Sequence, residues 1–237
     1  MFGMPGMFGW KNKILGNRIP VSYLHQSHNN SCVPTCIAML TWNLSYGVGT
    51  EYAATREAYR VAGRDSFVAH RTNKDMMEFY SKRGLALNDV DELIKIYGYR
   101  YEKISGISQE SSSAIANLNS SARSVAESRL GNMRHNDAML VIGDNGTHCT
   151  LLYKKNENYI FLDPRNEENC GAFNEIILEK KDHQEIGFGY KILTMSFENG
   201  LGAGVISDLF YIPSQNIPVR LINSKIKITP YLKDDWF

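Results

Sequence analysis

A cysteine at the expected start of a helix is the first residue with clear chemical potential. Cys32 stands where a polar, turn-forming run over residues 27–31 gives way to an apolar segment with helical character. The first turn of a helix has unpaired N–H groups and a partial positive charge, which favour thiolate over thiol. Ser31 is suited to cap this helix, and Pro34 falls in its first turn, where a missing N–H costs little. The sequence therefore predicts a nucleophilic role for Cys32.

A base and a group to orient it are expected far downstream. His148 lies near the start of a β-rich run over residues 147–153, and Asp163 follows a second run over residues 159–162. The charged connector between them has hairpin length. In an antiparallel hairpin the start of one strand lies beside the end of the next, so we expect the two side chains to be neighbours. Such an Asp fixes the imidazole tautomer, the imidazole takes the thiol proton, and the thiolate attacks a carbonyl carbon.

Gln26 lies six residues before Cys32 and completes the predicted site. A loop of that length can bring its amide N–H₂ back beside the sulfur, where an oxyanion forms during acyl transfer. Cys36 lies one turn after Cys32 on the same helical face, but the helix start and the Gln26 spacing favour Cys32. We expect Cys36 and Cys149 to be buried as small apolar residues.

These residues, in this order, resemble the papain-like cysteine peptidase superfamily. The similarity is strongest to bacteriocin-leader-processing peptidases and to papain-like domains of bacterial effectors and toxins. In those proteins a Gln precedes the Cys by six residues, and a Gly-His strand is followed by a strand that ends in Asp-Pro. The resemblance covers residues 22–165. Two positions differ from the family: Val33 and Pro34 follow the cysteine instead of Gly-Pro or Gly-Trp, and Cys149 follows the histidine.

The resemblance implies an α+β, papain-like fold in which a helical lobe packs on an antiparallel β-sheet. It implies Cys32 as nucleophile, His148 as general base and acid, and Asp163 as orienter, with Gln26 and the Cys32 backbone N–H as the oxyanion hole. The implied reaction is cofactor-free hydrolysis of peptide bonds in a protein or peptide substrate. Glutamine deamidation and transglutamination use the same triad, and a non-catalytic binding module on this fold is the other alternative. A role as a bacterial effector or toxin rests on the resemblance alone.

Composition and cysteine spacing argue against several other classes of protein, namely disordered, nucleic-acid-binding, disulfide-rich and metal-binding ones. The 237-residue chain is 43% hydrophobic and 11% aromatic, as in globular proteins, and its net charge of +1 gives no indication of nucleic-acid binding. Its four cysteines show neither a disulfide framework nor zinc-finger spacing. His25, His28 and Cys32 could supply three zinc ligands, but a fourth is lacking, so we predict no metal site. The glycines at 200, 202 and 204 lack the spacing of a phosphate-binding loop.

The sequence shows no secretory signal peptide and no transmembrane segment. The apolar N-terminus lacks the basic start and cleavage site of a secretory signal, and no apolar run approaches about 18 residues, the length that spans a membrane. We therefore expect a soluble, cytoplasmic protein, or one delivered into a host cell if it is an effector. Its oligomeric state is left open.

Hydrophobic periodicity and turn residues predict the elements that position these side chains. Helices are expected over residues 32–42, 50–62, 73–83, 89–97 and 114–132. Strands are expected over residues 18–24, 99–104, 138–143, 147–153, 159–162, 173–178 and 189–197. We predict a flexible arm over residues 1–17, a catalytic domain over residues 18–206, and an extension or extra hairpin over residues 207–237.

Overall fold

A six-stranded antiparallel sheet forms the centre of the protein in the computed structural model, with strand order β3-β10-β4-β5-β6-β7. The structure describes residues 10–27, 29–44, 54, 85–107, 116–143, 146–183, 187–194 and 204–216. The strands of the sheet are β3 (Glu102–Ser105), β4 (Ala138–Gly143), β5 (His148–Lys155), β6 (Asn158–Leu162), β7 (Gly171–Phe173) and β10 (Ile206–Ile212). All six residues of β4 are buried, because this continuous apolar strand is covered on both faces.

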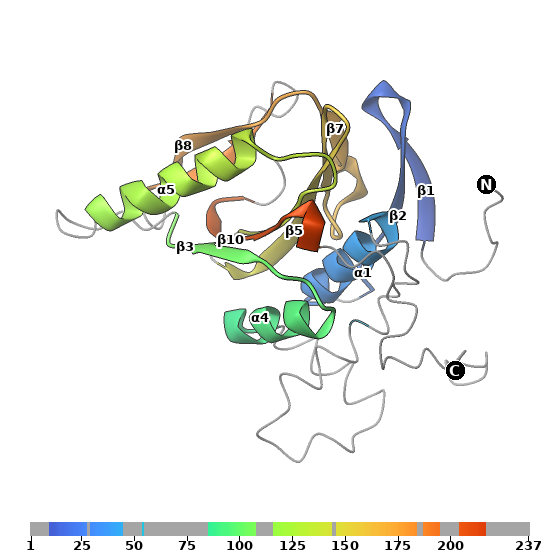
Figure 1. The fold of residues 1–237 in the computed structure, drawn as a ribbon, viewed down its shortest axis with the longest axis horizontal. Coiled ribbons are helices and arrows are strands. Elements are labelled where there is room, and N and C mark those ends of the chain that lie inside the picture. Colours follow the sequence, from blue (N-terminus) through green and yellow to red (C-terminus); the bar gives the residue numbers. More distant parts are fainter. Residues whose placement is uncertain are drawn as a thin grey trace, which may run out of the picture.

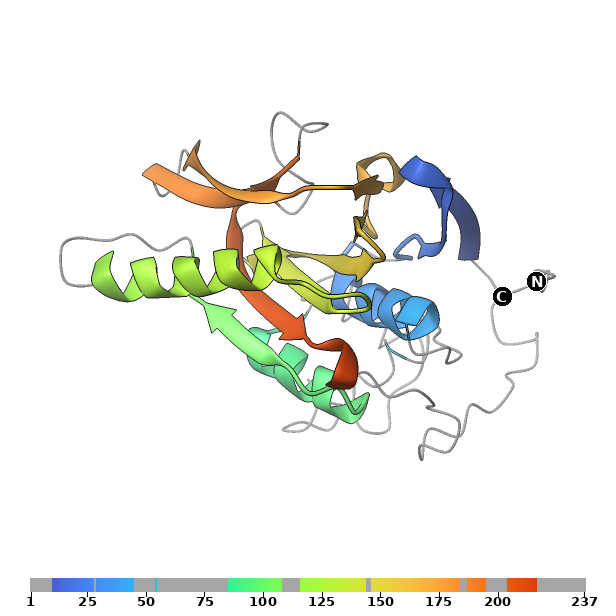
Figure 2. The same cartoon turned by 45° about the horizontal axis from the view of Figure 1, so that its top comes forward.

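The two faces of the sheet are covered by different elements (Figures 1 and 2). One face packs on helices α1 (Cys32–Leu44) and α4 (Leu87–Ile96) and on the hairpin β1 (Trp10–Leu15) and β2 (Ile19–Leu24), which are joined by the 3₁₀ turn η1 (Gly16–Arg18). The opposite face packs on helix α5 (Ala116–Gly131) and on the hairpin β8 (Ile177–His183) and β9 (Gly187–Leu193). Two short 3₁₀ helices, η4 (Glu167–Asn169) and η5 (Ser214–Asn216), complete the described elements.

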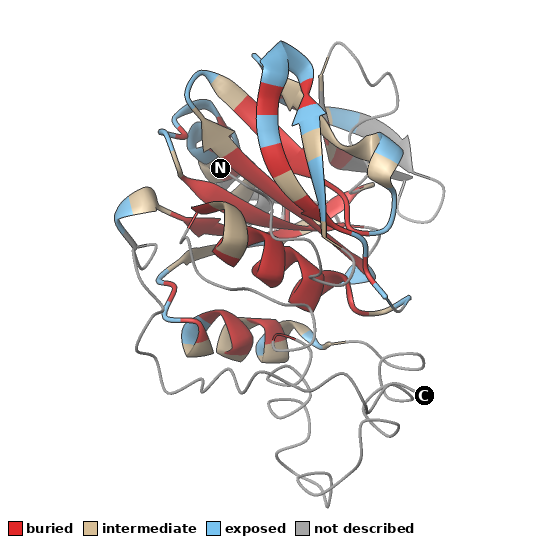
Figure 3. Ribbon diagram, turned by 90° about the vertical axis from the view of Figure 1, so that its right-hand side faces the viewer, coloured by how far each residue is buried: buried red, intermediate tan, exposed pale blue. Residues whose placement is uncertain are grey.

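Helix α1 is the most deeply buried helix that the structure describes, and it is red along most of its length in Figure 3. The Ser31 carbonyl accepts the first intrahelical bond, from the Thr35 N–H at 3.1 Å, so Ser31 occupies the predicted cap position and Cys32 begins the helix. At its far end, the Trp42 ring stacks on Trp10 of β1 at 5.1 Å. A helix that is apolar on all sides has to be enclosed, and here β2 and β5 enclose it.

The hairpin of β5 and β6 brings the two predicted strand-end residues together. Lys155 pairs with Asn158 and Leu151 pairs with Leu162, so the chain reverses over two residues. The first of these, Asn156, has a φ of 54°, which an asparagine tolerates better than most residues. In this register Asp163 comes level with the strand residue two positions after His148.

The coarse prediction of an α+β fold is confirmed, as are the helices expected over residues 32–42, 89–97 and 114–132. The helices predicted over residues 50–62 and 73–83 lie outside the described residues, apart from Ala54, which is helical. The expected strand over residues 173–178 is wrong as one element, because β7 ends at Phe173 and β8 begins at Ile177.

Both predicted domain boundaries need correction. Residues 10–17 were expected in a flexible arm, but residues 10–15 form β1, whose pairing with β2 and packing on Trp42 hold it in place. The boundary after residue 206 falls inside β10, which lies between β3 and β4 and buries Leu209 and Phe210. Residues 1–9 and 217–237 lie outside the described part. None of the described helices is long and apolar enough to cross a membrane.

Candidate active site

The first turn of α1 lies over the start of β5. The Cys36 thiol donates a hydrogen bond to the Cys149 carbonyl, with the sulfur 3.4 Å from the oxygen. Cys32 lies one helical turn before Cys36, and His148 lies one residue before Cys149, so the contact between Cys36 and Cys149 aligns the two predicted catalytic residues. The interaction between Cys32 and His148 is strong enough to affect the pKa of the imidazole. The helix and the strand therefore place a thiol beside an imidazole.

His148 and Asp163 form a buried pair at the open end of the β5–β6 hairpin. The His148 Nε2 atom lies 2.9 Å from Asp163 Oδ1, and the two side chains are only 1% and 2% exposed. A carboxylate can only accept, so Nε2 donates and the neutral imidazole keeps Nδ1 as its basic nitrogen. Nδ1 is buried and has no hydrogen bond of good geometry within the described residues. Because Nε2 is occupied by Asp163, Nδ1 is the ring nitrogen left to interact with the Cys32 thiol.

Asp163 is held on both of its carboxylate oxygens. Oδ1 also accepts the Arg165 backbone N–H at 2.9 Å, and Oδ2 accepts the Asn169 side-chain amide at 2.9 Å. Burial alone raises the pKa of Asp163, but the hydrogen bonds from His148, Asn169 and the Arg165 N–H outweigh burial and lower it. The carboxylate is therefore charged at neutral pH and fixed in orientation.

The charge state of His148 follows from its two neighbours. Burial alone lowers the pKa of the imidazole, but the hydrogen bond with Asp163, the interaction with the Cys32 sulfur and the charges of both groups raise it to about 9. An imidazolium at neutral pH, held between a carboxylate and a sulfur, is the arrangement that stabilises a thiolate nucleophile.

Gln26 lies in the loop that leads to Cys32, and the structure ties this loop to the turn after Asp163. The Gln26 backbone N–H donates to the Pro164 carbonyl at 2.9 Å, and the Tyr23 hydroxyl donates to the Asp163 carbonyl at 3.0 Å. The Gln26 side chain is buried, and its Nε2 atom donates to the Asn29 carbonyl at 2.9 Å. The amide is thus anchored within the loop before the thiol, and its place over a bound carbonyl stays a prediction.

The other three cysteines have different surroundings. Cys36 and Cys149 are fully buried, as predicted, and burial followed by hydrogen bonding to Cys149 raises the pKa of Cys36 well above its ordinary value. Burial also raises the pKa of Cys170, to about 11. Cys32 is 6% exposed, whereas Cys36 and Cys149 are 0% exposed, so of the cysteines at the α1–β5 contact only Cys32 reaches the surface.

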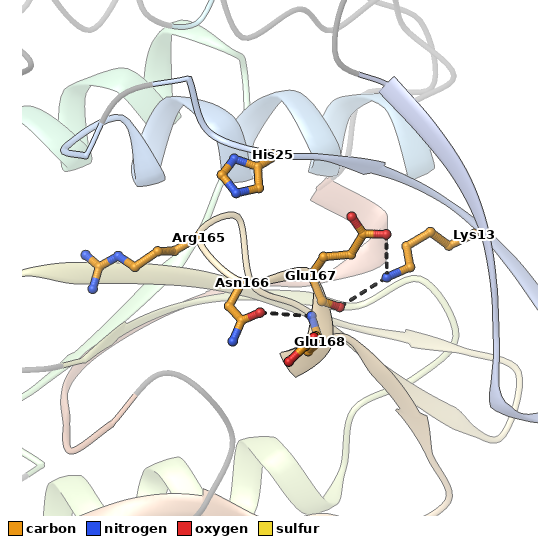
Figure 4. Close-up of a pocket in the computed structure, with 6 residues that line it drawn as sticks. All are labelled: Lys13, His25, Arg165, Asn166, Glu167 and Glu168. Carbon is orange, nitrogen blue, oxygen red and sulfur yellow. Dashed lines mark hydrogen bonds and ion pairs between the residues drawn. The ribbon is translucent and has the colours of Figure 1, made fainter.

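A pocket with a volume of about 460 Å³ borders the same two loops (Figure 4). It lies between the β1–β2 hairpin and the loop after β6. His25 and Arg165, which stand beside Gln26 and Pro164 in the chain, belong to its wall. All of its lining residues are polar or charged: Lys13, His25, Arg165, Asn166, Glu167 and Glu168.

The structure thus brings Cys32, His148 and Asp163 together and places Gln26 in the adjoining loop. Sequence reasoning missed Asn169 and Tyr23, both of which hold Asp163 or its turn. The one signal for Asn169 is a run of polar residues directly after Asp163, which indicates only a loop. The set of zinc ligands considered above includes His28, which lies outside the described residues.

Models of known protein families, curated proteins and solved structures give no match to this chain. Function therefore has to be argued from the chemistry of the chain's own residues.

Proposed function

We propose that the protein is a papain-like cysteine hydrolase that cleaves peptide bonds in a protein or peptide substrate. The observation that carries this proposal is the buried contact between His148 Nε2 and Asp163 Oδ1, made by an imidazole whose other side faces the Cys32 thiol at the start of α1. A buried Asp-His pair beside a cysteine at a helix start is the constellation that cysteine acyl transfer requires.

The reaction begins when the Cys32 sulfur attacks the carbonyl carbon of the scissile bond and the carbonyl oxygen becomes an oxyanion. Gln26 and the Cys32 backbone N–H are the donors assigned to that oxyanion. The C–N bond then breaks, His148 gives its proton to the leaving amine, and a thioester remains on Cys32. Water attacks the thioester with His148 as base, which releases the acid and restores the thiol.

Asp163 serves the same proposal by positioning the base. Its bond to Nε2 keeps Nδ1 toward Cys32, and its charge stabilises the imidazolium that is present before acylation and forms again when His148 acts as base in deacylation. The bonds from Asn169 and the Arg165 N–H keep the carboxylate from rotating away. In this proposal the groups that carry out acyl transfer are side chains and backbone N–H groups of the chain, with water as the second nucleophile.

The proposal is tested with a peptide library prepared by digesting a bacterial proteome, incubated with the wild-type chain and with Cys32→Ala. We expect new peptide termini only with the wild type, and a rate lower by about 10³-fold or more in the variant. Cys36→Ser is the matched control, because it changes a neighbouring thiol that the mechanism does not use and keeps a donor for the Cys149 carbonyl. Cleavage that persists in Cys32→Ala would contradict the proposal.

The same experiment separates the reactions that share this triad. Hydrolysis of the peptide bond gives two fragments, whereas glutamine deamidation leaves the peptide intact and adds about one mass unit as ammonia is replaced by water. Transglutamination joins an amine to the glutamine side chain and adds the mass of that amine less ammonia. An unchanged library, together with an inert Cys32, would favour a binding module.

A further inference from the structure

The pocket beside the candidate active site has walls that continue the active-site loops. His25 precedes Gln26, and the Gln26 N–H bonds to the Pro164 carbonyl, directly before Arg165. The Arg165 N–H bonds to Asp163. Since consecutive residues of an extended peptide are about 3.3 Å apart, a substrate that reaches Cys32 can present a side chain to the pocket from a nearby position.

Some of the charged side chains that line the pocket form ion pairs within the described residues and others do not. Glu167 is bound by two lysines: Lys11 Nζ lies 2.6 Å from Oε2, and Lys13 Nζ lies 3.0 Å from Oε1. Hydrogen bonds with these lysines lower the pKa of Glu167, so its carboxylate is fully charged at neutral pH and is shared between two cations. These two lysines and Glu167 together carry one positive charge more than negative, with Lys11 standing outside the pocket lining, and Glu167 has no capacity to bind a third cationic group well.

Arg165 is the second cation of the pocket lining, after Lys13, and its guanidinium has no carboxylate partner in the described part of the chain. It is exposed, and Figure 4 shows its side chain extending away from the Lys13–Glu167 pair. The His25 Nδ1 atom donates to the Gln26 carbonyl at 2.8 Å, which leaves Nε2 on the other side of the ring. Glu168 is the one lining carboxylate without a cation bound to it among the described residues.

We propose that this pocket binds an acidic side chain of the peptide substrate and that Arg165 is the residue that selects it, an inference that rests on the proposed hydrolase function. A guanidinium can bind a carboxylate through two parallel N–H donors, which gives both attraction and geometry. Glu168 opposes this binding from its side of the pocket and limits its strength.

The test measures binding without turnover. Fluorescein-labelled eight-residue peptide pools, each with Glu, Gln or Lys fixed at one position, are titrated into the Cys32→Ala chain and followed by fluorescence anisotropy. We expect one position at which the Glu pool binds about fivefold tighter than the Gln pool and the Lys pool binds weakest, a size typical of a partly exposed ion pair. Equal affinities of the Glu and Gln pools at every position would overturn the inference.

Three further substitutions, each combined with Cys32→Ala, make the assignment to Arg165 specific. Arg165→Glu is expected to reverse the order so that the Lys pool binds tightest, and its backbone N–H to Asp163 is unaffected by the change. Glu168→Gln is expected to widen the preference for Glu. Arg100→Glu, an exposed arginine outside the pocket, is expected to leave it unchanged. A preference for Glu that survives Arg165→Glu contradicts the inference, whereas a Glu preference that Arg165→Glu reverses, found together with no cleavage by the wild-type chain, counts against the hydrolase proposal alone.

Discussion

Two buried carboxylates at strand ends of the same sheet, Asp163 after β6 and Asp137 before β4, allow a direct comparison of two regions. Each residue is 2% exposed. Asp137 Oδ2 accepts from the Arg134 backbone N–H at 2.7 Å and from the Tyr211 hydroxyl at 2.6 Å. Its Oδ1 atom accepts from the Ser214 backbone N–H at 2.7 Å. The donors Tyr211 and Ser214 lie at and just after the end of β10, and Asp137 lies at the start of the neighbouring strand β4, so Asp137 links these two strands and has a structural role.

Asp163 has the same burial but different partners. It also binds a backbone N–H, that of Arg165, yet one oxygen is shared with an imidazole whose second nitrogen faces a thiol. Burial followed by the hydrogen bond to Asp137 raises the pKa of Tyr211, so the Tyr211 hydroxyl keeps its proton near neutral pH. Burial and hydrogen bonding of a carboxylate therefore do not by themselves identify an active site. What distinguishes Asp163 is that its partner is an imidazole, which can exchange a proton near neutral pH and which also interacts with a thiol.

The largest expected difference between the two regions is in hydrolysis. Asp163→Asn is expected to lower the cleavage rate by about 10³-fold, because an amide in place of the carboxylate holds the wrong imidazole tautomer. Asp137→Asn is expected to destabilise the fold by about 1–3 kcal/mol, since it leaves a buried donor poorly satisfied, and to keep the cleavage rate at temperatures where the chain is folded. Rates and urea denaturation of both variants check this. Equal rate losses in the two variants would erase the distinction.

The pH dependence of stability is the next largest expected effect. The pKa of His148 is raised from 6.5 to about 9 in the folded protein. The stabilisation from this group is therefore fully present below about pH 6.5 and is lost as pH rises through about 9. It is on the order of 3 kcal/mol, because each tenfold change in proton affinity is worth about 1.4 kcal/mol.

Urea unfolding of the wild type and of His148→Gln at several pH values measures this contribution. We expect the unfolding free energy of the wild type, relative to the variant, to fall between about pH 6.5 and 9. Cys32→Ala is expected to reduce the fall without removing it, since Asp163 also raises the pKa of His148. A pH-independent difference between wild type and His148→Gln would mean that the imidazole has no charged partners in the folded chain.

The smallest expected effect concerns Asn169, whose amide donates to Asp163 Oδ2 as the Tyr211 hydroxyl donates to Asp137 Oδ2. Asn169→Ala removes the amide donor to Asp163 Oδ2 and with it one of the bonds that lower the pKa of Asp163. We expect hydrolysis to slow by about tenfold, and its acid limb to move to higher pH because the carboxylate protonates more easily. An unchanged acid limb in the rate profile would show that Asn169 has only a structural role.

Local signals in the sequence were sufficient for the parts of the site that depend on near neighbours. The Ser31 cap, Pro34 and the apolar run after Cys32 predicted where α1 begins, and the structure begins it there. The strands on either side of residues 154–158 predicted that His148 and Asp163 would be neighbours, because hairpin register follows from a short connector.

Long-range pairing was beyond sequence reasoning. The residues of β10 were predicted to begin an extension, yet β10 lies inside the sheet between β3 and β4. Local sequence signals could not predict this pairing, because the two partner strands are about 60 to 110 residues away in the chain. The bond from Asn169 to Asp163 depends on the path of a loop, and loops carry no periodic signal. Pairing of β1 with β2 was missed because the arm boundary was placed by composition alone.

The most direct measurement of the central claim, that Cys32 and His148 act as a coupled pair, is iodoacetamide labelling with peptide mapping of all four cysteines. It is carried out between about pH 5.5 and 8.5, across the range in which an ordinary thiol becomes reactive. The paired imidazolium predicts that Cys32 is modified fastest, at a rate that hardly changes with pH, and that His148→Asn makes this rate rise with pH as in a model thiol. A wild-type Cys32 that already behaves as a model thiol, or a rate untouched by His148→Asn, would contradict the account.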